Sequence, residues 1–462
     1  MSEKSSKNPS NTPNNIHCII LAAGMGTRMK SQKSKVLHEV SGKPMVEIVL
    51  DLARSVGEKT TVVASNENHL EIAKLLKNES EAIVIQSERL GTGHAVATAI
   101  AEIEKSNAEK IVILYGDTPL VTKETVEKMA LENNDVTFLG FEELDVSNKY
   151  GRLILDEHSA TLHNNERGRL LAIVEYKDAN DDQKAITICN SGVVCISKNT
   201  LLNALKKLKP SEVTGEYYLT DVVSIANYEG EKCGFLKCEK SEVLGVNSRE
   251  DLAVVDNIMQ KRIKSLHMQN GATFLLPKTS YVFLGAKIGK DVTIQQSCFL
   301  GKNVEIKDCV EIRAFSHLEG CVVESGACVG PFVRIRPNTI IEENAGIGNF
   351  VEVKNSRIGK KSKAGHLSYI GDSQIGESVN IGAGTVFCNY NGFEKFESKV
   401  GDGSFIGSNS TIISPVEIAK GTIVAAGSVV TKSTQENSLV IARSEQVEIP
   451  NGGGKFRKKH GK

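Results

Sequence analysis

The sequence predicts two folded units of different class: an α/β unit with a mostly parallel sheet, followed by a parallel β-helix of hexapeptide repeats. The β-helix is indicated by branched aliphatic residues that recur at every sixth position, a period that fits neither a strand nor a helix. The α/β unit is indicated by short apolar strands that alternate with helical stretches. A charged amphipathic segment between the two patterns predicts a helical linker over residues 249–270.

The aliphatic period runs unbroken through three stretches of the C-terminal half. The residues are Val282, Ile288, Ile294, Leu300, Ile306 and Ile312; Val323, Val329, Ile335, Ile341, Ile347 and Val353; and Val400, Ile406, Ile412, Ile418, Val424 and Val430. Glycine often follows the aliphatic residue, as in Ile406-Gly407, where we expect the backbone to turn tightly. The period breaks at 388–399, which predicts a loop that leaves the coil. The β-helix is expected over residues 271–450.

The α/β unit is expected over residues 16–248. Its first buried strand, 16–21, ends in Ala-Ala-Gly, and further strands are predicted at 60–64, 82–85 and 110–115. Helices are predicted between them, for example at 45–56 and 95–104. Ligands of such sheets bind beyond the carboxyl ends of the strands.

The composition bears on partners, membrane insertion and the redox setting of the protein. The 56 basic and 56 acidic residues balance, so bulk charge gives no sign of a nucleic-acid or membrane partner. No apolar run reaches the roughly 18 residues of a membrane span. The ten cysteines are scattered, which suggests small buried residues in a reducing, cytoplasmic setting. Residues 1–15 are predicted to be a disordered extension, and residues 451–462 a flexible basic tail.

A glycine-rich loop, 21–29, directly follows the first strand. Gly24 and Gly26 would let backbone N–H groups approach phosphate oxygens, while Arg28 and Lys35 supply positive charge. The loop is no Walker motif, and Met29 stands where a dinucleotide fingerprint has its third glycine. Taken alone, the loop could also be no more than a tight strand-to-helix turn, which is the less favoured of the two interpretations.

Two more motifs follow predicted strands. One contains Gln86, Gly91 and Thr92, and the other is Tyr115-Gly116-Asp117. Asp117 would place a carboxylate at a strand end, and a magnesium ion that bridges phosphates needs such a hard oxygen ligand.

Together these motifs resemble the Rossmann-like sugar-phosphate nucleotidyltransferases, which carry a Leu-Ala-Ala-Gly-x-Gly-Thr-Arg-Met loop. The later stretches match in order: Gly151, Glu175, Asn190, 216–221 and 245–247. The resemblance is most specific to the bacterial bifunctional N-acetylglucosamine-1-phosphate uridyltransferases/glucosamine-1-phosphate acetyltransferases. It covers roughly residues 16–447.

This resemblance implies a UTP and UDP-N-acetylglucosamine site and a magnesium pair. The implied nucleotide-sugar ligands are Leu21, Ala22, Ala23, Gly24, Gly26, Arg28, Lys35, Gln86, Gly91, Thr92, Tyr115, Gly116, Asp117, Gly151, Glu175, Asn190 and Asn247. Asp117 and Asn247 are the implied metal ligands. Two departures are visible: Met25 stands where the family often has lysine, and Ser34 replaces the usual proline before Lys35. The first would remove one charge near the phosphates.

The β-helix carries polar residues that a plain scaffold does not need: Arg336, Lys354, His366, Tyr369, Asn380 and Lys395. The cations could hold the phosphate of an amino sugar, and the hydroxyl and amide could hold its ring. His366 could serve as the general base that deprotonates an attacking amine. Alone, such a histidine is more often a packed or surface residue.

Its setting resembles the acetyltransferase half of the same bifunctional family, with a left-handed β-helix. The resemblance implies His366 as the base and Arg336, Lys354, Tyr369, Asn380 and Lys395 as amino-sugar phosphate ligands. The implied acetyl-CoA contacts are Ala383, Asn389, Tyr390, Ser408, Ala426 and Arg443. It also implies a homotrimer, in which the loop at 388–399 reaches a neighbour and Lys395 approaches the neighbour's His366.

The sequence therefore predicts a cytoplasmic enzyme with two activities. One acetylates glucosamine 1-phosphate with acetyl-CoA; the other joins N-acetylglucosamine 1-phosphate to UTP with Mg²⁺, giving a precursor for peptidoglycan and lipopolysaccharide. Two alternatives stay open: a nucleotidyltransferase whose β-helix only regulates or oligomerises, and a non-enzymatic scaffold. The complete polar set on the β-helix argues against the first, and Asp117 paired with Asn247 argues against the second.

Overall fold

The computed structural model describes residues 15–156 and 166–461, so the extension predicted at 1–15 lies almost wholly outside the described residues. The chain forms two compact units, Met1–Met259 and Gln260–Lys462. The boundary falls inside helix α10 (Arg249–Gln269), at the position of the predicted linker. No helix in the described part is long and apolar enough to cross a membrane.

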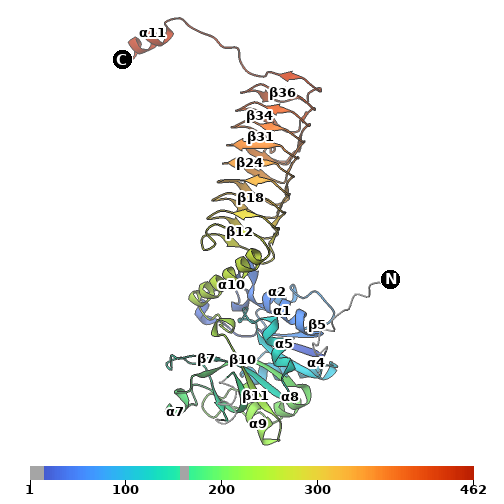
Figure 1. Cartoon of the computed structure of the whole chain (residues 1–462), viewed down its shortest axis with the longest axis vertical. Helices are drawn as coiled ribbons and strands as arrows, with labels where there is room; N and C mark the ends of the chain where they lie inside the picture. Colours follow the sequence, from blue (N-terminus) through green and yellow to red (C-terminus); the bar gives the residue numbers. More distant parts are fainter. Residues whose placement is uncertain (1–14, 157–165, 462) are drawn as a thin grey trace, which may run out of the picture. The chain divides into compact units, whose positions relative to one another are not determined.

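The first unit is built on a nine-stranded sheet with the order β5-β4-β1-β6-β10-β7-β11-β9-β8 (Figure 1). Its strands are β1 (Ile16–Leu21), β4 (Lys59–Ala64), β5 (Glu81–Ile85), β6 (Lys110–Tyr115), β7 (Val136–Glu142), β8 (Arg152–Leu155), β9 (Arg167–Val174), β10 (Ile188–Ser197) and β11 (Cys233–Cys238). The four predicted strands are β1, β4, β5 and β6, and they are parallel. The other half of the sheet is mixed, since β10 runs antiparallel to both β6 and β7.

Helices cover both faces of this sheet. They are α1 (Met45–Val56), α2 (His69–Ala73), α3 (Thr92–Thr98), α4 (Ile100–Lys105), α5 (Lys123–Leu131), α7 (Asp181–Lys184), α8 (Lys198–Leu205) and α9 (Val222–Tyr228). Helix α1 has the predicted bounds. The helix predicted at 95–104 is two helices that break at Ala99, and the first begins earlier, directly after Gly91.

Strand β1 explains why the sheet needs helices on both sides. Ile16, Cys18 and Ile20 pack into one apolar cluster, whereas Ile19 packs into the cluster on the opposite face. Successive side chains of a strand point to opposite faces, so a strand that is apolar throughout must be buried twice.

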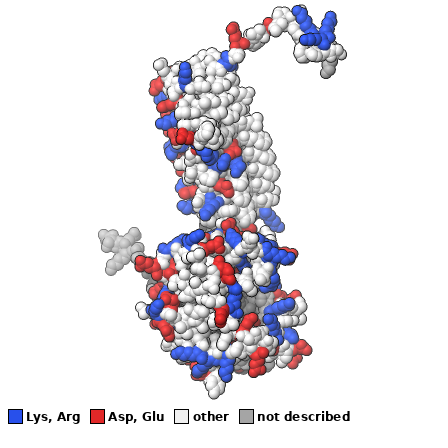
Figure 2. Space-filling view, turned by 180° about the vertical axis from the view of Figure 1, so that it is seen from behind, with Lys and Arg blue, Asp and Glu red and all other residues white. Residues whose placement is uncertain are grey.

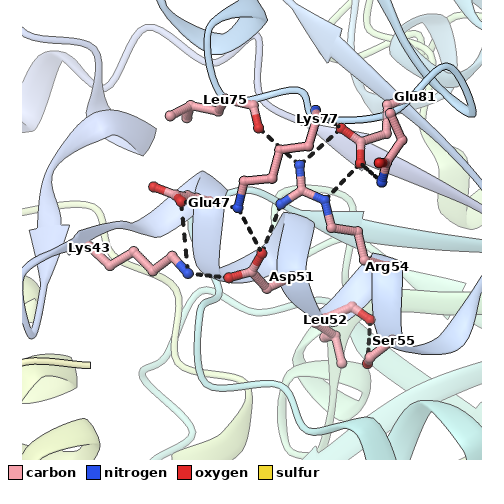
Figure 3. A network of polar contacts seen from close by, with 10 residues as sticks. Lys43, Glu47, Asp51, Leu52, Arg54, Ser55, Leu75, Lys77 and Glu81 are labelled. Atoms are coloured by element: carbon pink, nitrogen blue, oxygen red, sulfur yellow. Dashed lines mark hydrogen bonds and ion pairs between the residues drawn. The ribbon is translucent and has the colours of Figure 1, made fainter. Parts of the chain in front are cut away.

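An ion-pair network fastens α1 to the chain before β5 (Figure 3). The guanidinium of Arg54 donates to Glu81 at 2.7 and 2.9 Å, to Asp51 at 2.8 Å and to the carbonyl oxygen of Leu75 at 2.9 Å. Asp51 also pairs with Lys43, in β3 (Lys43–Pro44). The network thus fixes the short segment between α1 and the turn η2 (Lys35–Leu37), which carries Lys35.

The second unit is a left-handed parallel β-helix whose rungs stack into three sheets, here called the first, second and third faces (Figure 1). The first face contains β12 (Thr273–Phe274), β15 (Thr293–Ile294), β18 (Glu311–Ile312), β21 (Cys328–Val329), β24 (Gly346–Asn349), β27 (Lys363–His366), β30 (Asn380–Ile381), β33 (Phe405–Ile406), β36 (Ile423–Val424) and β38 (Leu439–Val440). The second face contains β13 (Tyr281–Val282), β16 (Phe299–Leu300), β19 (His317–Leu318), β22 (Arg334–Ile335), β25 (Glu352–Lys354), β28 (Tyr369–Gly371), β31 (Val386–Cys388), β34 (Thr411–Ile413) and β37 (Val429–Val430). The third face contains β14 (Lys287–Ile288), β17 (Glu305–Ile306), β20 (Cys321–Val323), β23 (Thr339–Ile341), β26 (Arg357–Ile358), β29 (Ser373–Ile375), β32 (Ser398–Val400) and β35 (Glu417–Ile418).

The aliphatic residues of the six-residue period fill the interior of the coil. All those predicted are buried except Ile288, which is half-buried. The glycines that follow them have a different reason from the predicted tight turn. A Cβ at Gly407 would lie 2.7 Å from the Cα of Ala426 in the next coil, and the left-handed backbone comes two residues later, at Asn409 (φ 54°). Close approach of neighbouring coils therefore selects glycine there.

The predicted loop is a hairpin inserted between β31 and β32. Tyr390 pairs with Lys395, and Phe396 N donates to Asn389 O at 2.9 Å. The coil register shows the insertion, because Lys363 pairs with Asn380 but Asn380 pairs with Phe405. At the C-terminus, where a flexible tail is predicted, the structure has a helix, α11 (Gly452–Lys459), with no buried residue.

Two candidate active sites

A cavity of about 360 Å³ opens at the carboxyl ends of the parallel strands of the first unit. Its lining consists of the last residues of β1 and β6, of residues that follow β1, β5 and β6, and of Glu216 from the chain between α8 and α9. The lining residues are Leu21, Ala22, Ala23, Gly24, Lys35, Val36, Gln86, Arg89, Gly91, Thr92, Ala95, Tyr115, Asp117 and Glu216. Three motifs that are far apart in the sequence therefore share one cavity, as the parallel sheet requires.

The two glycines of the loop have different structural reasons. Gly26 has a left-handed backbone (φ 62°), and a Cβ there would lie 2.5 Å from the Cβ of Lys35. Gly24 is exposed, and a Cβ on it would have no protein atom within 4 Å. Gly26 thus lets the loop pack on Lys35, whereas the space beside Gly24 stays open toward the cavity.

Lys35, Asp117 and Asn247 meet at one point of this unit. The ammonium of Lys35 pairs with the carboxylate of Asp117 and donates to Asn247 Oδ1 at 3.2 Å. Two oxygen atoms from different segments thus converge on one cation. Carboxylate and amide oxygens are ligands that Mg²⁺ accepts, so this pair fits a divalent hard cation beside the lysine.

A second group of predicted residues gathers beyond Tyr115. Asn190 N donates to Gly151 O at 2.8 Å, and a Cβ on Gly151 would lie 3.4 Å from Glu175 Oε2. Burial raises the pKa of Glu175, and the carboxylates of neighbouring acidic residues raise it further. Burial also raises the pKa of Tyr115, with added contributions from the charges of Glu175 and Asp117. Tyr115 therefore lies within electrostatic range of both Glu175 and Asp117.

Some predicted residues are not cavity walls. Arg28 is exposed, and Gly116 packs closely, since a Cβ there would lie 3.2 Å from Val36 Cγ1. Sequence reasoning missed Arg89, which lines the cavity and donates through Nε to Ala23 O at 3.1 Å. Its position between Gln86 and Gly91 is the sequence feature that could have marked it as a cavity residue.

Two of the predicted sugar-phosphate cations lie at the carboxyl ends of strands in the second face, with Arg336 directly after β22 and Lys354 at the end of β25. Arg336 pairs with Glu352 at 2.9 Å, and the next coil places Lys354 in line with Gly371. Lys395, on the inserted hairpin, lies beside Lys354 of its own chain: the Lys354 ammonium holds the pKa of Lys395 below its usual value.

His366 ends β27 at the edge between the first and second faces. Its Nδ1 lies 2.6 Å from Asn349 Oδ1. Since an amide oxygen can only accept, Nδ1–H donates and Nε2 is left as the basic nitrogen. The arrangement is that of a base oriented by a neighbouring amide.

Three predicted acetyl-CoA residues stand in one column with His366. Lys363 is level with Asn380, and each coil continues this register, which aligns His366 with Ala383, Ser408 and Ala426. Arg443 donates to the carbonyl oxygen of Ala426 at 2.5 Å. The column is a continuous strip along one edge of the prism.

Other predicted residues lie apart from it. Asn380 begins β30 and is level with Lys363, three residues before His366. Three residues of a strand span roughly 10 Å, so Asn380 and His366 lie at opposite edges of the first face. Tyr390 is exposed, with its hydroxyl bonded to Gly392 O at 2.6 Å, while Asn389 is buried.

Family models match both units. A MobA-like NTP transferase domain matches residues 18–208, and a bacterial transferase hexapeptide model of six repeats matches residues 397–432. The chain is therefore a transferase that combines a nucleotidyltransferase unit with a hexapeptide acyltransferase unit.

Curated relatives match across both units. The "Bifunctional protein GlmU" of Paramagnetospirillum magneticum is 42% identical over 444 residues, which is 95% of this chain and 96% of that protein. The proteins of the same name from Zymomonas mobilis and a Ruegeria species are 40% and 41% identical, over 96% and 95% of this chain and 97% and 96% of theirs. The chain belongs to the family of bifunctional GlmU proteins and is a bifunctional enzyme with uridyltransferase and acetyltransferase activities.

Proposed function

We propose that this enzyme first acetylates glucosamine 1-phosphate with acetyl-CoA and then joins the product to UTP, giving UDP-N-acetylglucosamine and pyrophosphate. The meeting of Lys35, Asp117 and Asn247 beside one cavity supports the second reaction most directly. We assign the uridyl reaction to residues 16–248 and the acetyl reaction to residues 271–450.

In uridyl transfer, Asp117 and Asn247 would hold Mg²⁺, whose charge neutralises phosphate oxygens when it is bound. Lys35 would pair with the same phosphates, and the open space beside Gly24 would admit them to the backbone N–H groups. A phosphate oxygen of the sugar attacks the α-phosphorus of UTP, and the bond to pyrophosphate breaks. Catalysis then consists of positioning and charge neutralisation.

We assign the uracil of UTP and the sugar of the sugar phosphate to two different groups of residues. Gln86, Gly91 and Thr92, which line the cavity, would read the uracil. Gly151, Glu175 and Asn190 would hold the sugar, where the half-buried carboxylate of Glu175 can accept hydrogen bonds from hydroxyl groups.

In acetyl transfer, the amine of the sugar attacks the thioester carbon of acetyl-CoA. His366 Nε2 takes the amine proton, the amide bond forms and the CoA thiol leaves. Arg336, Lys354 and Lys395 supply the charge that holds the sugar phosphate. The strip of Ala383, Ser408 and Ala426 beside the base offers a small-residue surface along which the cofactor can extend.

The second site becomes complete in a homotrimer. Asn380 and His366 lie at opposite edges of one face, so a neighbouring copy has to bring one of them to the other. Phe315, Phe332 and Phe350 also form an exposed stacked column, with ring centroids 4.9 and 5.4 Å apart. Figure 2 shows that the β-helix carries charged side chains on one side, while an adjacent side is uncharged. Exposed apolar side chains such as these three phenylalanines are typical of subunit contacts.

For Lys395, contact with a neighbour's His366 stays a prediction, because its own chain already places it beside Lys354. UTP and acetyl-CoA are metabolites of the cytoplasm, where we place the enzyme. Its product would supply peptidoglycan and lipopolysaccharide synthesis.

Two assays on the purified protein separate this function from its alternatives. Acetyl transfer is followed by thiol release from acetyl-CoA with glucosamine 1-phosphate, and uridyl transfer by pyrophosphate release from UTP with N-acetylglucosamine 1-phosphate. Both should proceed. Uridyl transfer alone would indicate a regulatory β-helix, and neither reaction would indicate a scaffold.

A further inference from the structure

A buried aspartate, Asp372, follows β28 at the corner between the second and third faces. It is 9% exposed, and neither the motifs nor the resemblance gives it a role. Its Oδ1 accepts a hydrogen bond from Asn355 Nδ2 at 2.6 Å, and its Oδ2 accepts one from Asn389 Nδ2. Lys354 Nζ lies 3.9 Å from the same Oδ2.

Asp372 contacts both ends of the inserted hairpin. Asn389, at the start of the hairpin, donates from its side chain, and the backbone N–H of Ser398, just after it, donates to Asp372 O at 3.2 Å. The backbone N–H of Asp372 in turn donates to Lys354 O at 3.0 Å. One residue therefore joins the coil that carries Lys354 to the hairpin that carries Lys395.

The charge of Asp372 opposes a repulsion between two lysines. The Lys354 ammonium lowers the pKa of Lys395, while the charge of Asp372 and the Tyr369 hydroxyl act in the opposite direction. Like charges at close range separate unless an anion lies beside them. The carboxylate thus favours a conformation in which both lysines face one spot.

The corner itself does not require a carboxylate. Gly320, Asn338 and Asn355 occupy the corresponding corner of the three preceding coils, with φ of 53°, 61° and 45°, and Asp372 has φ 48°. Asparagine and glycine both tolerate this left-handed backbone. The turn can therefore be kept while the carboxylate is removed.

We propose that Asp372 is a positioning residue of the acetyl-transfer site: it fastens the hairpin 389–396 to the coil and fixes Lys395 beside Lys354 for the sugar phosphate. This inference rests on the proposed acetyl transfer. Because the hairpin also carries Asn389 and Tyr390, loosening it disturbs the acetyl-CoA contacts together with the phosphate contacts.

Electrostatics alone gives the opposite expectation, which makes the proposal testable. A carboxylate near a phosphate repels it, so removing the charge with no change in position would lower the KM for glucosamine 1-phosphate. If the carboxylate mainly holds the hairpin, its removal raises the KM of both substrates, because the ordering of the loop must then occur on binding.

The test compares Asp372→Gly and Asp372→Asn with Asn338→Gly, a control at the same corner two coils away. All are full-length proteins, and uridyl transfer in the same chain reports correct folding of the first unit. We expect Asp372→Gly to raise both acetyl-transfer KM values about tenfold with kcat changed less, and to speed amide hydrogen exchange in residues 389–397. Asp372→Asn, which restores a side-chain hydrogen-bonding group, should lie between Asp372→Gly and the native chain. Asn338→Gly should change neither KM.

Three results would overturn the proposal: a lowered KM for glucosamine 1-phosphate in Asp372→Asn, equal effects of Asp372→Gly and Asn338→Gly, or unchanged exchange of the hairpin in Asp372→Gly. Absence of acetyl transfer from the native protein would instead overturn the proposed function itself.

Discussion

The two sites of this chain are assembled in different ways. In the α/β unit, loops after three parallel strands converge on one cavity, and residues more than 200 positions apart, Lys35 and Asn247, share a hydrogen bond. On the β-helix, the candidate residues lie along the edges and outer faces of a prism whose interior is filled with aliphatic side chains. The first fold brings distant segments to a point, while the second spreads them over a surface.

The difference decides what one chain can do alone. A sheet with loops at one edge can enclose its own ligand. A prism has no concave interior, so a site on its surface needs either an added loop or another prism. This chain has an added loop, the hairpin at 389–396. Its Asn380 and His366 lie at opposite edges of the first face.

The largest expected effect comes from a substitution of His366, which should impair one activity and spare the other. His366→Ala should lower acetyl transfer by about 10²–10⁴-fold, because it removes the proposed base. Uridyl transfer of the same protein, measured by pyrophosphate release, should stay near the native rate. Acetyl transfer within twofold of native would remove His366 from the mechanism.

A substitution of Asp117 should have the opposite result, with uridyl transfer lost and acetyl transfer retained. Asp117→Ala removes the proposed carboxylate ligand of magnesium and should lower uridyl transfer by more than about 100-fold, since even outer-shell changes at metal sites cost 10–100-fold. Acetyl transfer should persist, as it needs no metal. Chelation by EDTA supplies the control: equal inhibition of both reactions would contradict the metal assignment.

The two glycines of the loop form a matched pair. Gly24→Ala meets no protein atom, so the melting temperature should hold while the KM for UTP rises about tenfold if phosphate fills that space. Gly26→Ala forces a left-handed backbone, which costs about 1–2 kcal/mol, and crowds Lys35, so the protein should also melt earlier. Equal KM values for native and Gly24→Ala proteins would place the phosphates elsewhere.

The smallest effect concerns pH. Because burial raises the pKa of Glu175, the folded chain holds this proton more tightly than the unfolded chain. The group therefore costs no stability below its ordinary pKa, and stability falls as pH rises through the raised pKa. Glu175→Gln should raise the melting temperature at pH 8 by up to roughly 2 °C and leave it unchanged near pH 4. An equal rise of the melting temperature at pH 8 and at pH 4 would contradict a raised pKa of Glu175.

Patterns local in the sequence predicted much of the fold. The six-residue period located the interior of the β-helix, since nearly every strand of every coil has to bury one aliphatic residue. The parallel strands β1, β4, β5 and β6 followed from their apolar runs. Strands β7 to β11 were not identified from the sequence, and glycine and polar residues interrupt the apolar runs of β9 and β10.

The sites show the same limit. Motifs led to Lys35, Asp117 and His366, but nothing local shows that Arg89 reaches Ala23, or that Asp372 contacts both ends of a hairpin. The glycine at 407 was expected for the wrong reason, as its constraint comes from a residue in the next coil. Contacts between segments that are distant in sequence leave no periodic trace in the chain.

We propose that the nucleotide site is complete in one chain, whereas the acetyl site is shared between copies. The most direct measurement mixes His366→Ala and Asn380→Ala proteins, reassembles them as verified mixed oligomers and assays both reactions. Each mixed trimer has one interface of three with both residues intact, so we expect acetyl transfer to return to about a third of the native rate, while uridyl transfer stays unchanged throughout. No recovery of acetyl transfer in verified mixed oligomers would contradict the shared site.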